Sequence, residues 1–281
     1  MNTADTSGIP SAADSAARPF HGRDGGGSNP GGRPRCVLVT GATSGIGRAV
    51  VRRFLSGGWR VLATGRNAAA LEALRSDAPD RVETYEADLS STDGVSALLR
   101  RVVPAHQRLD ALVNAAGVIS NDTVAGFTPE AFHRMLALNV TAPALLTQGL
   151  LPLLEAAEGA VVNISSVTGT RAFPGLFSYC VSKAALDQAT RCAALELAPR
   201  KIRVNAVNPG VVITELHRRG GMSDDAYAAF LEKAKTTHPL GRPGDADEVA
   251  EAVWFLGTPA ASWITGVTLA VDGGRAETCL R

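Results

Sequence analysis

Tyr179 and Lys183 are the two residues whose types and spacing suggest acid–base chemistry. They lie four residues apart in a segment without internal Pro or Gly, so on a helix both side chains share one face. A phenol titrates near ~10 and needs assistance to exchange a proton at neutral pH. A neighbouring Lys ammonium lowers that pKa, which would let Tyr179 donate a proton to a carbonyl or accept one from an alcohol. Taken alone, the same spacing is also typical of a surface pair on a helix.

Two polar residues upstream can complete a catalytic set. Ser166 precedes Tyr179 by thirteen residues and follows a predicted strand, at the end where open α/β sheets bind their ligands. A hydroxyl there can hydrogen-bond a reacting oxygen and stabilise developing charge, whereas Ser165 is expected to finish the strand. Asn139 lies among apolar neighbours in a predicted helix, where its amide could also satisfy an ordinary helix hydrogen bond.

A glycine-rich segment follows the first predicted strand, with the spacing Gly-x3-Gly-x-Gly and a helical pattern directly after it. Glycines let the backbone approach a pyrophosphate, and a helix N-terminus offers free N–H groups and a positive dipole. The spacing differs from G-x-G-x-x-G and lacks the Lys-Ser/Thr of a triphosphate loop. Its place at the first strand–helix junction nevertheless predicts a dinucleotide site. The expected contacts are Gly41, Thr43, Ser44, Gly45, Ile46 and Gly47.

The end of the second predicted strand bears on which nicotinamide is bound. NAD-specific proteins place Asp or Glu there to accept from the ribose 2′-hydroxyl. This chain has Gly65 at that position, followed by Arg66, whose guanidinium can pair with a 2′-phosphate. We therefore predict NADP(H). NAD(H) stays possible, because a one-residue shift in register or a solvated Arg66 would weaken the case.

These residues need a parallel sheet to position them. From Arg35 onward, short apolar and β-branched runs alternate with amphipathic helical patterns, which predicts right-handed crossovers and an α/β, doubly wound Rossmann fold. The expected strands are Cys36–Thr40, Arg60–Thr64, Val82–Glu86, Ala111–Asn114, Ala160–Ser165, Arg203–Val207 and Val267–Val271. The expected helices include Ile46–Ser56, Glu130–Glu155, Ser178–Ala198 and Asp247–Gly257.

Composition limits the remaining possibilities. The chain has 281 residues with 28 Lys and Arg against 27 Asp and Glu, so its net charge gives no general reason to expect nucleic acid or a membrane surface as partner. Residues 1–34 are rich in Gly, Ser and Pro and are expected to be a disordered tail, with one catalytic domain over 35–281. Four scattered cysteines predict neither disulfides nor a metal site. A cytoplasmic location is favoured, because acidic residues in the tail argue against a mitochondrial transit peptide.

The ordered motifs resemble those of the short-chain dehydrogenase/reductase family over residues 35 to 274, in the branch similar to 3-oxoacyl-carrier-protein reductases. They are Thr40-Gly41-x3-Gly45-x-Gly47, Asp88-Leu89, Asn114-Ala115-Ala116-Gly117, Asn139, Asn163-Ile164-Ser165-Ser166, Tyr179-x3-Lys183, Pro209-Gly210, Gly241-Arg242-Pro243-Gly244 and Val271-Asp272-Gly273-Gly274. The resemblance implies a single domain with seven parallel strands, assembled as a homotetramer or homodimer. One subunit contact would use the helices Glu130–Glu155 and Ser178–Ala198, and the second contact of a tetramer would use Val253–Ile264 and Val267–Val271. Ala115 departs from the family pattern, which usually has a second Asn there.

The resemblance also implies roles for individual residues. Catalysis would use Asn139, Ser166, Tyr179 and Lys183, with Asn139 holding a water that links Lys183 to solvent. Asp88 would contact the adenine, although it could instead cap the following helix. Further cofactor contacts would come from Leu89, Asn114, Ala115, Gly117, Tyr179, Lys183, Pro209, Gly210, Val212 and Thr214.

Residues Glu215–His238 correspond to the family's substrate lid, with a hinge at Gly220-Gly221 and a helix at Ala226–Lys235. The other expected pocket residues are mainly apolar and favour a lipophilic carbonyl. They are Val118, Ile119, Arg171–Phe177 and Val211. Basic residues in these segments leave a 3-oxoacyl thioester possible, unless they form a solvated rim. They are Arg171, His217, Arg218 and Arg219.

The sequence as a whole predicts an NADP(H)-dependent oxidoreductase that interconverts a secondary alcohol and a ketone by hydride transfer. An NAD-dependent alcohol or steroid dehydrogenase is the alternative within the same chemistry. A non-catalytic cofactor-binding scaffold is a different class, and the presence of all four catalytic positions argues against it.

Overall fold

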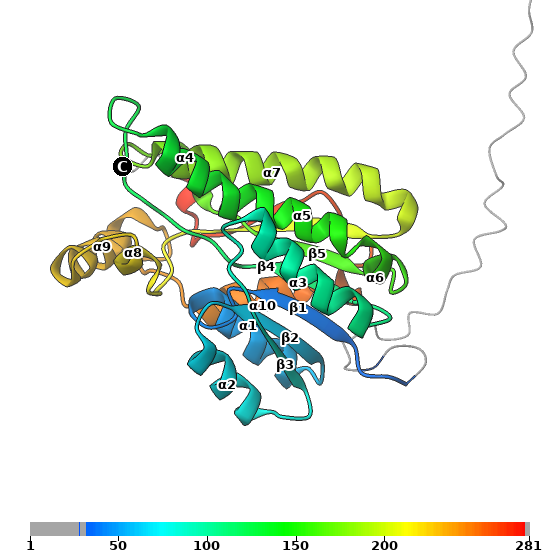
Figure 1. Ribbon diagram of the computed structural model, residues 1–281. Helices are drawn as coiled ribbons and strands as arrows, with labels where there is room; N and C mark the ends of the chain where they lie inside the picture. The colour runs from blue at the N-terminus through cyan, green and yellow to red at the C-terminus, as the bar shows by residue number, and fades with distance from the viewer. Residues whose placement is uncertain (1–27, 29–31, 279–281) are drawn as a thin grey trace, which may run out of the picture.

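The centre of the molecule is one parallel sheet with the strand order β3-β2-β1-β4-β5-β6-β7 (Figure 1). The computed structural model describes residue 28 and residues 32–278. The strands are β1 (Cys36–Thr40), β2 (Arg60–Gly65), β3 (Val82–Glu86), β4 (Ala111–Asn114), β5 (Ala160–Ile164), β6 (Arg203–Pro209) and β7 (Thr268–Val271). Each neighbouring pair is parallel. The order reverses between β1 and β4, which is the switch point where such sheets bind ligands. The predicted fold class is confirmed.

Helices cover both faces of the sheet and bury two separate hydrophobic clusters (Figure 1). One face carries α1 (Gly45–Ser56), α2 (Ala68–Asp77) and α10 (Ala246–Gly257), and the other carries α3 (Thr92–Ala105), α5 (Ala142–Gly149) and α7 (Phe177–Leu197). This double cover explains why β1 and β5 are apolar along their length, since every residue of both strands is buried. The short helix α8 (Leu216–Arg219) and the longer α9 (Asp224–Thr237) lie apart from these layers, at one end of the molecule.

Polar side chains at helix starts set most of these boundaries. Asn67, Ser91 and Ser223 each accept a hydrogen bond from a backbone N–H in the first turn of α2, α3 and α9. Asp245 and Glu248 form a reciprocal capping box at the start of α10. The predicted lid helix Ala226–Lys235 lies inside α9, which is slightly longer at both ends.

The predicted continuous helix Glu130–Glu155 is wrong. The structure has α4 (Pro129–Leu136), a π-helical turn (Ala137–Thr141), α5, and α6 (Leu151–Glu155) in its place. In the wide turn the N–H of Ala142 bonds the carbonyl of Ala137, five residues earlier. Pro143 and Pro152 lie at the starts of α5 and α6, where their missing N–H groups are tolerated but break continuity with the preceding turn.

Most of the predicted tail, residues 1–34, lies outside the described residues. Over residue 28 and residues 32–278, the structure contains no helix with the length and apolar character needed to cross a membrane.

Candidate active site

A large cavity lies at the carboxyl ends of the strands. Its volume is about 1880 Å³, well above the roughly 300–1,000 Å³ of ordinary ligand pockets. It therefore has room for a dinucleotide and a second molecule. Of the site residues predicted from the sequence, all of which are described, only Asn114 and Asn139 do not line it.

The glycine-rich loop between β1 and α1 forms one end of the cavity. Gly41 has a φ of +63°, and a Cβ there would lie 2.9 Å from the backbone of Ala116. A Cβ on Gly47 would overlap the carbonyl of Gly41, so α1 can approach β1 only without a side chain. The Ser44 hydroxyl makes no capping bond to any described residue, which leaves N–H groups of the first turn of α1 available at the cavity wall. These features fit an anionic pyrophosphate.

Thr40 joins this loop to the one that follows β4. Its hydroxyl oxygen accepts hydrogen bonds from the backbone N–H groups of Ala115 and Ala116, both at 2.9 Å. The contact uses the backbone of Ala115, so replacement of the family's usual Asn by Ala does not remove it.

Asn114 has a structural contact instead of a place in the cavity wall. Its amide nitrogen donates to Oδ1 of Asn163 at 2.8 Å, and the amide of Asn163 donates to Thr190 at 2.9 Å. The chain of bonds ties β4 to β5 and to α7. Asn114 does not line the cavity, so the structure gives no support to the cofactor contact expected from its side chain.

The end of β2 has little space for an acidic side chain. A Cβ on Gly65 would lie 2.8 Å from the methyl group of Thr43. Arg66 follows, exposed and lining the cavity. Asp88 also lines it, and its carboxylate accepts a hydrogen bond from the N–H of Ser90 at 3.0 Å, which lowers the pKa of Asp88. Asp88 is thus both a local cap and part of the wall.

Tyr179 and Lys183 lie buried in the first turns of α7, next to the end of β5. The Lys183 ammonium donates to the carbonyl of Ile164 at 2.8 Å and lies 5.7 Å from the centre of the Tyr179 ring. Burial lowers the pKa of Lys183 to about 8, and the carboxylate of Asp187 opposes this change.

The direction of the Tyr179 pKa differs from the sequence-based expectation. Burial raises the pKa of Tyr179 to about 12, with a hydrogen bond to Ser166 acting in the opposite direction. Desolvation of the phenolate outweighs the stabilisation expected from Lys183, because the ring is enclosed by protein. At neutral pH the phenol is therefore protonated and suited to donate a proton.

The two serines after β5 have different partners. The oxygen of Ser166 accepts from the N–H of Thr168 at 3.1 Å, which leaves its O–H free to donate toward Tyr179. The hydroxyl of Ser165 donates to the backbone carbonyl of Lys183 at 3.3 Å. This difference supports the choice of Ser166 as the residue that faces a reacting oxygen.

Asn139 lies in the π-helical turn, behind the cavity wall. Its Oδ1 accepts from the N–H of Val118 at 2.9 Å, while its amide donates to the carbonyl of Val118 and to Ser182, both at 3.0 Å. A Cβ on Gly117 would lie 3.3 Å from Asn139 Oδ1 and 3.7 Å from Lys183 Nζ. Gly117 therefore lets both polar groups approach the same point of the backbone.

Asp122 is a residue of the site that the sequence analysis missed. Its carboxylate accepts from the N–H of Ser178 at 2.9 Å and from the Ser178 hydroxyl, and its backbone bonds Gly175 and Phe177. Asp122 thus caps α7 from a distant loop and fixes the turn that carries Tyr179. No local pattern signals a cap contributed from 56 residues away.

Asp187, also missed, lies one turn beyond Lys183 on the buried face of α7. It accepts from the amide of Asn208 on β6 at 2.8 Å. Its spacing of four residues from Lys183 was the available signal.

The expected pocket residues all line the cavity, and the lid contributes His217, Met222 and Phe230. His217 is more enclosed than a rim residue: its ring centre is 4.5 Å from that of Phe230, and burial lowers its pKa. Cys180 also lines the cavity.

Two of the basic residues proposed for substrate have protein partners. The guanidinium of Arg171 donates to the carbonyls of Ala276 and Thr278 at 2.7 and 2.6 Å. Arg218 forms ion pairs within the lid. Arg219 lines the cavity from an exposed position, as a solvated rim residue would.

Comparison with known proteins gives consistent matches over most of the chain. The family described as enoyl-(acyl carrier protein) reductase matches residues 41–276. The chain is 36% identical to L-xylulose reductase of Caenorhabditis elegans, over 85% of this chain and 94% of that protein. It is 34% identical to the 3-oxoacyl-(acyl-carrier-protein) reductase FabG of Thermotoga maritima, over 85% and 97%.

Solved structures give the same picture. A short-chain dehydrogenase/reductase of unknown function from Caenorhabditis elegans, crystallised with cofactor, aligns with a TM-score of 0.80 at 32% identity, over 87% of this chain and 96% of that one. Aldohexose dehydrogenase of Thermoplasma acidophilum aligns with a TM-score of 0.78 at 29% identity, over 88% and 96%.

Proposed function

Because the chain belongs to the short-chain dehydrogenase/reductase family, we propose that it interconverts a ketone and a secondary alcohol with NADP(H) as its cofactor. Family membership makes it an oxidoreductase of carbonyl and alcohol groups that uses a nicotinamide cofactor. The observation that carries the proposal is the buried Tyr179 beside Ser166 and Lys183, in one cavity with the glycine-rich loop.

Each residue of the site has a distinct role in the proposed reaction. When bound, the nicotinamide supplies or accepts the hydride. Tyr179 gives its proton to the carbonyl oxygen during reduction, and Ser166 hydrogen-bonds the same oxygen as charge develops. Lys183 holds positive charge near the phenol, and Asn139 keeps the wall at Val118 in place. Oxidation of an alcohol needs the phenolate, so its rate should rise with pH while that of reduction falls.

The glycine-rich loop and the start of α1 are proposed to hold the pyrophosphate, and Arg66 to pair with the 2′-phosphate of NADP(H). The lack of space for an acidic side chain at Gly65 supports this preference. Asp88 and Leu89 would flank the adenine, and the segment Pro209–Thr214 the nicotinamide.

The substrate is proposed to be a lipophilic or 3-oxoacyl-type ketone. Ile119, Leu176 and Phe230 are among the apolar side chains that line the far half of the cavity. A small polyhydroxylated ketone is the second candidate, favoured by the similarity to L-xylulose reductase and to D-erythrulose reductase of Gallus gallus. We propose a cytoplasmic homotetramer or homodimer.

A substrate panel tests the proposal. Ketones, 3-oxoacyl thioesters, ketoses, steroids and quinones are each incubated with NADPH and with NADH, and oxidation is followed by absorbance. We expect turnover with NADPH on at least one apolar ketone or 3-oxoacyl thioester. Turnover of ketoses alone would show that the substrate is a polyhydroxylated ketone and not a lipophilic one. The absence of turnover with every ketone in the panel would contradict the proposed function.

The cofactor preference has its own test. Arg66→Asp places a carboxylate where the 2′-phosphate should bind, so we expect kcat/KM with NADPH to fall about 100-fold, as loss of a charge-assisted contact plus repulsion implies. The ratio between NADPH and NADH should therefore reverse. Arg100→Asp makes the same change of charge at an exposed position of α3 that does not line the cavity, and it is the matched control. An unchanged ratio in Arg66→Asp would contradict the assignment.

A further inference from the structure

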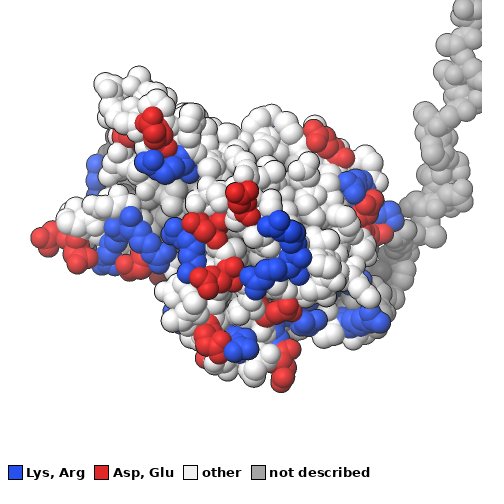
Figure 2. Space-filling view, in the orientation of Figure 1, with Lys and Arg blue, Asp and Glu red and all other residues white. Residues whose placement is uncertain are grey.

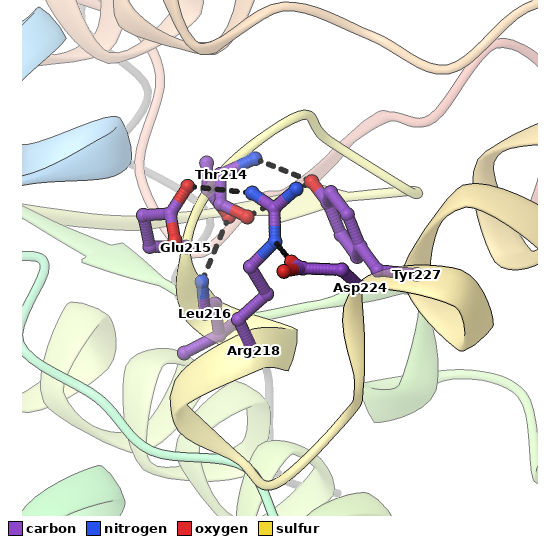
Figure 3. Close-up of polar contacts among 6 residues, drawn as sticks. All are labelled: Thr214, Glu215, Leu216, Arg218, Asp224 and Tyr227. Carbon is purple, nitrogen blue, oxygen red and sulfur yellow. Dashed lines mark hydrogen bonds and ion pairs between the residues drawn. The ribbon is translucent and has the colours of Figure 1, made fainter.

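Tyr227 lies at the junction of the lid with the rest of the molecule. It is on α9 and is 2% exposed, although most of this helix faces solvent. Its hydroxyl donates to the backbone carbonyl of Thr214 at 2.9 Å and accepts from the N–H of Thr214 at 3.1 Å (Figure 3). One phenol thus satisfies both backbone groups of a residue that belongs to no strand or helix.

Arg218 closes over the outer face of the same ring. Its guanidinium lies 4.3 Å from the ring centre and pairs with Glu215 at 2.8 Å and Asp224 at 2.7 Å (Figure 3). Exposed ion pairs contribute little individually, but a guanidinium stacked on a ring and held by two carboxylates has a defined position. The arrangement joins α8 and α9 into one unit around Tyr227.

Thr214 connects this unit to the cofactor half of the cavity. Its side chain packs against the glycine-rich loop, so that a Cβ on Gly45 would lie 3.3 Å from its methyl group. Its hydroxyl oxygen accepts from the N–H of Leu216, the first residue of α8, at 3.4 Å. Thr214 and Gly45 both line the cavity, whereas Tyr227 is not among its described lining residues. Tyr227 therefore reaches the glycine-rich loop through Thr214.

We propose that Tyr227 is a positioning residue that couples the α8–α9 lid to the cofactor. Its hydroxyl holds the backbone of Thr214 against the glycine-rich loop, in the conformation that receives the cofactor, and the same two bonds hold the lid closed. The inference rests on the proposed use of NADP(H) in this cavity. Coupling of this kind is reciprocal: a bound cofactor that fixes Thr214 stabilises the closed lid, and a closed lid strengthens cofactor binding.

Tyr227→Phe isolates the two hydrogen bonds, because the ring and its stacking on Arg218 are retained. Tyr85→Phe is the matched control: this tyrosine is also buried and bonds Glu83 and His106 through its hydroxyl, but it lies on β3 away from the cavity. NADPH affinity is measured by fluorescence titration. Lid opening is measured as the rate of tryptic cleavage at Lys233 and Lys235 of α9, with and without NADPH, since cleavage inside a helix requires local opening.

In the wild type and in Tyr85→Phe, we expect NADPH to bind equally well and to slow cleavage of α9. In Tyr227→Phe, the Kd for NADPH should rise about tenfold, the effect of roughly one lost buried hydrogen bond, and NADPH should no longer slow cleavage. A Tyr227→Phe protein with wild-type affinity and wild-type protection would overturn the inference while leaving the proposed function intact. A wild type that binds no nicotinamide cofactor would overturn both.

Arg218→Gln keeps the test decisive if Tyr227→Phe does not fold. The substitution removes the guanidinium that stacks on Tyr227 and pairs with Glu215 and Asp224. Because Arg218 is exposed, the fold should be retained. We expect the same two changes in smaller measure, about two- to threefold in Kd, as loss of an exposed ion-pair network implies. Unchanged affinity and unchanged protection in this variant would also count against the coupling.

Discussion

At the residue scale, the chemistry depends on two buried groups whose pKa values shift in opposite directions. Burial raises the pKa of Tyr179 to about 12 and lowers that of Lys183 to about 8, because each loses the water that would solvate its charged form. The motif Tyr-x3-Lys predicts that the two groups are neighbours. It does not predict how far the surrounding wall excludes water, which is decided by segments remote in sequence such as Asp122 and Val118.

The Lys183 pKa leads to a prediction about stability. Between pH 8 and 10.5 the unfolded chain holds a proton on Lys183 that the folded chain has released, so the contribution of Lys183 to the free energy of unfolding should rise with pH over this window. Lys183→Met should remove that contribution. The measurement is the melting temperature from pH 7.5 to 10.5, with the exposed Lys201→Met as control. Parallel curves for wild type and Lys183→Met would show that burial does not shift this group.

At the element scale, the active site depends on where helices begin. The sequence predicts α1 and α7 to within a residue, because neither helix contains a proline and α1 has a clear apolar periodicity. Pro143 and Pro152 were available signals for the break of the Glu130–Glu155 segment, and the prediction of one helix overlooked them. The π-helical turn has no such local signal, since Asn139 bonds the backbone of Val118 across the fold. In the same way, Asn114 matches a cofactor motif but bonds Asn163 in the next strand.

Asp122 provides the element-scale prediction. Asp122→Ala removes the cap of α7, so we expect a loss of about 1–2 kcal/mol in the free energy of unfolding and, because Tyr179 shifts with the first turn, a fall in kcat of roughly ten- to a hundredfold. Ser91→Ala is the matched control, since Ser91 caps α3 through the N–H of Gly94 at 3.1 Å, away from the cavity. It should lose about 1 kcal/mol with unchanged kcat. Equal kcat in both variants would show that the Asp122 cap does not position Tyr179.

At the scale of the whole molecule, the cavity has two halves, one formed by loops with recognisable sequence motifs and one formed by segments without them. The half proposed to bind the cofactor is built from the loops after β1, β2 and β4, which carry recognisable motifs, and most of the residues predicted for it line the cavity. The half proposed to bind the substrate is lined by residues of α8, α9 and the segment near Thr278. Arg218 and Tyr227 hold α8 and α9 to the segment at Thr214, and Arg171 holds the segment near Thr278. These hydrogen bonds and ion pairs join segments that carry no recognisable motif. The sequence therefore predicted a lid, but it did not predict the contacts that hold the lid in place.

The surface also bears on assembly. Basic and acidic side chains are interspersed over much of one face, while the area over α5 is mostly uncharged (Figure 2). Leu195 on α7 is 79% exposed and Trp263, after α10, is 98% exposed. Apolar side chains as exposed as these commonly mark protein–protein contacts when they lie in a larger patch. They fall in the two segments for which subunit contacts were predicted.

Trp263→Glu tests this assembly. A charge at the centre of the predicted C-terminal contact should prevent that contact, because a buried unpaired carboxylate is costly. By light scattering after gel filtration, we expect a tetramer for the wild type and a dimer for Trp263→Glu. The control is Leu240→Glu, which changes an exposed apolar residue outside the predicted contacts and should leave the tetramer unchanged. A wild-type monomer, or equal masses for wild type and Trp263→Glu, would contradict the prediction.

The central claim is that Tyr179 transfers the proton in a nicotinamide-dependent reaction, and Tyr179→Phe tests it most directly. The substitution removes one hydroxyl from an enclosed ring, so the fold and cofactor binding should be preserved. Single-turnover reduction of an active substrate by NADPH should slow by at least ~100-fold, the usual contribution of a positioned general acid, with the Kd for NADPH changed little. Wild-type turnover in Tyr179→Phe would contradict the account.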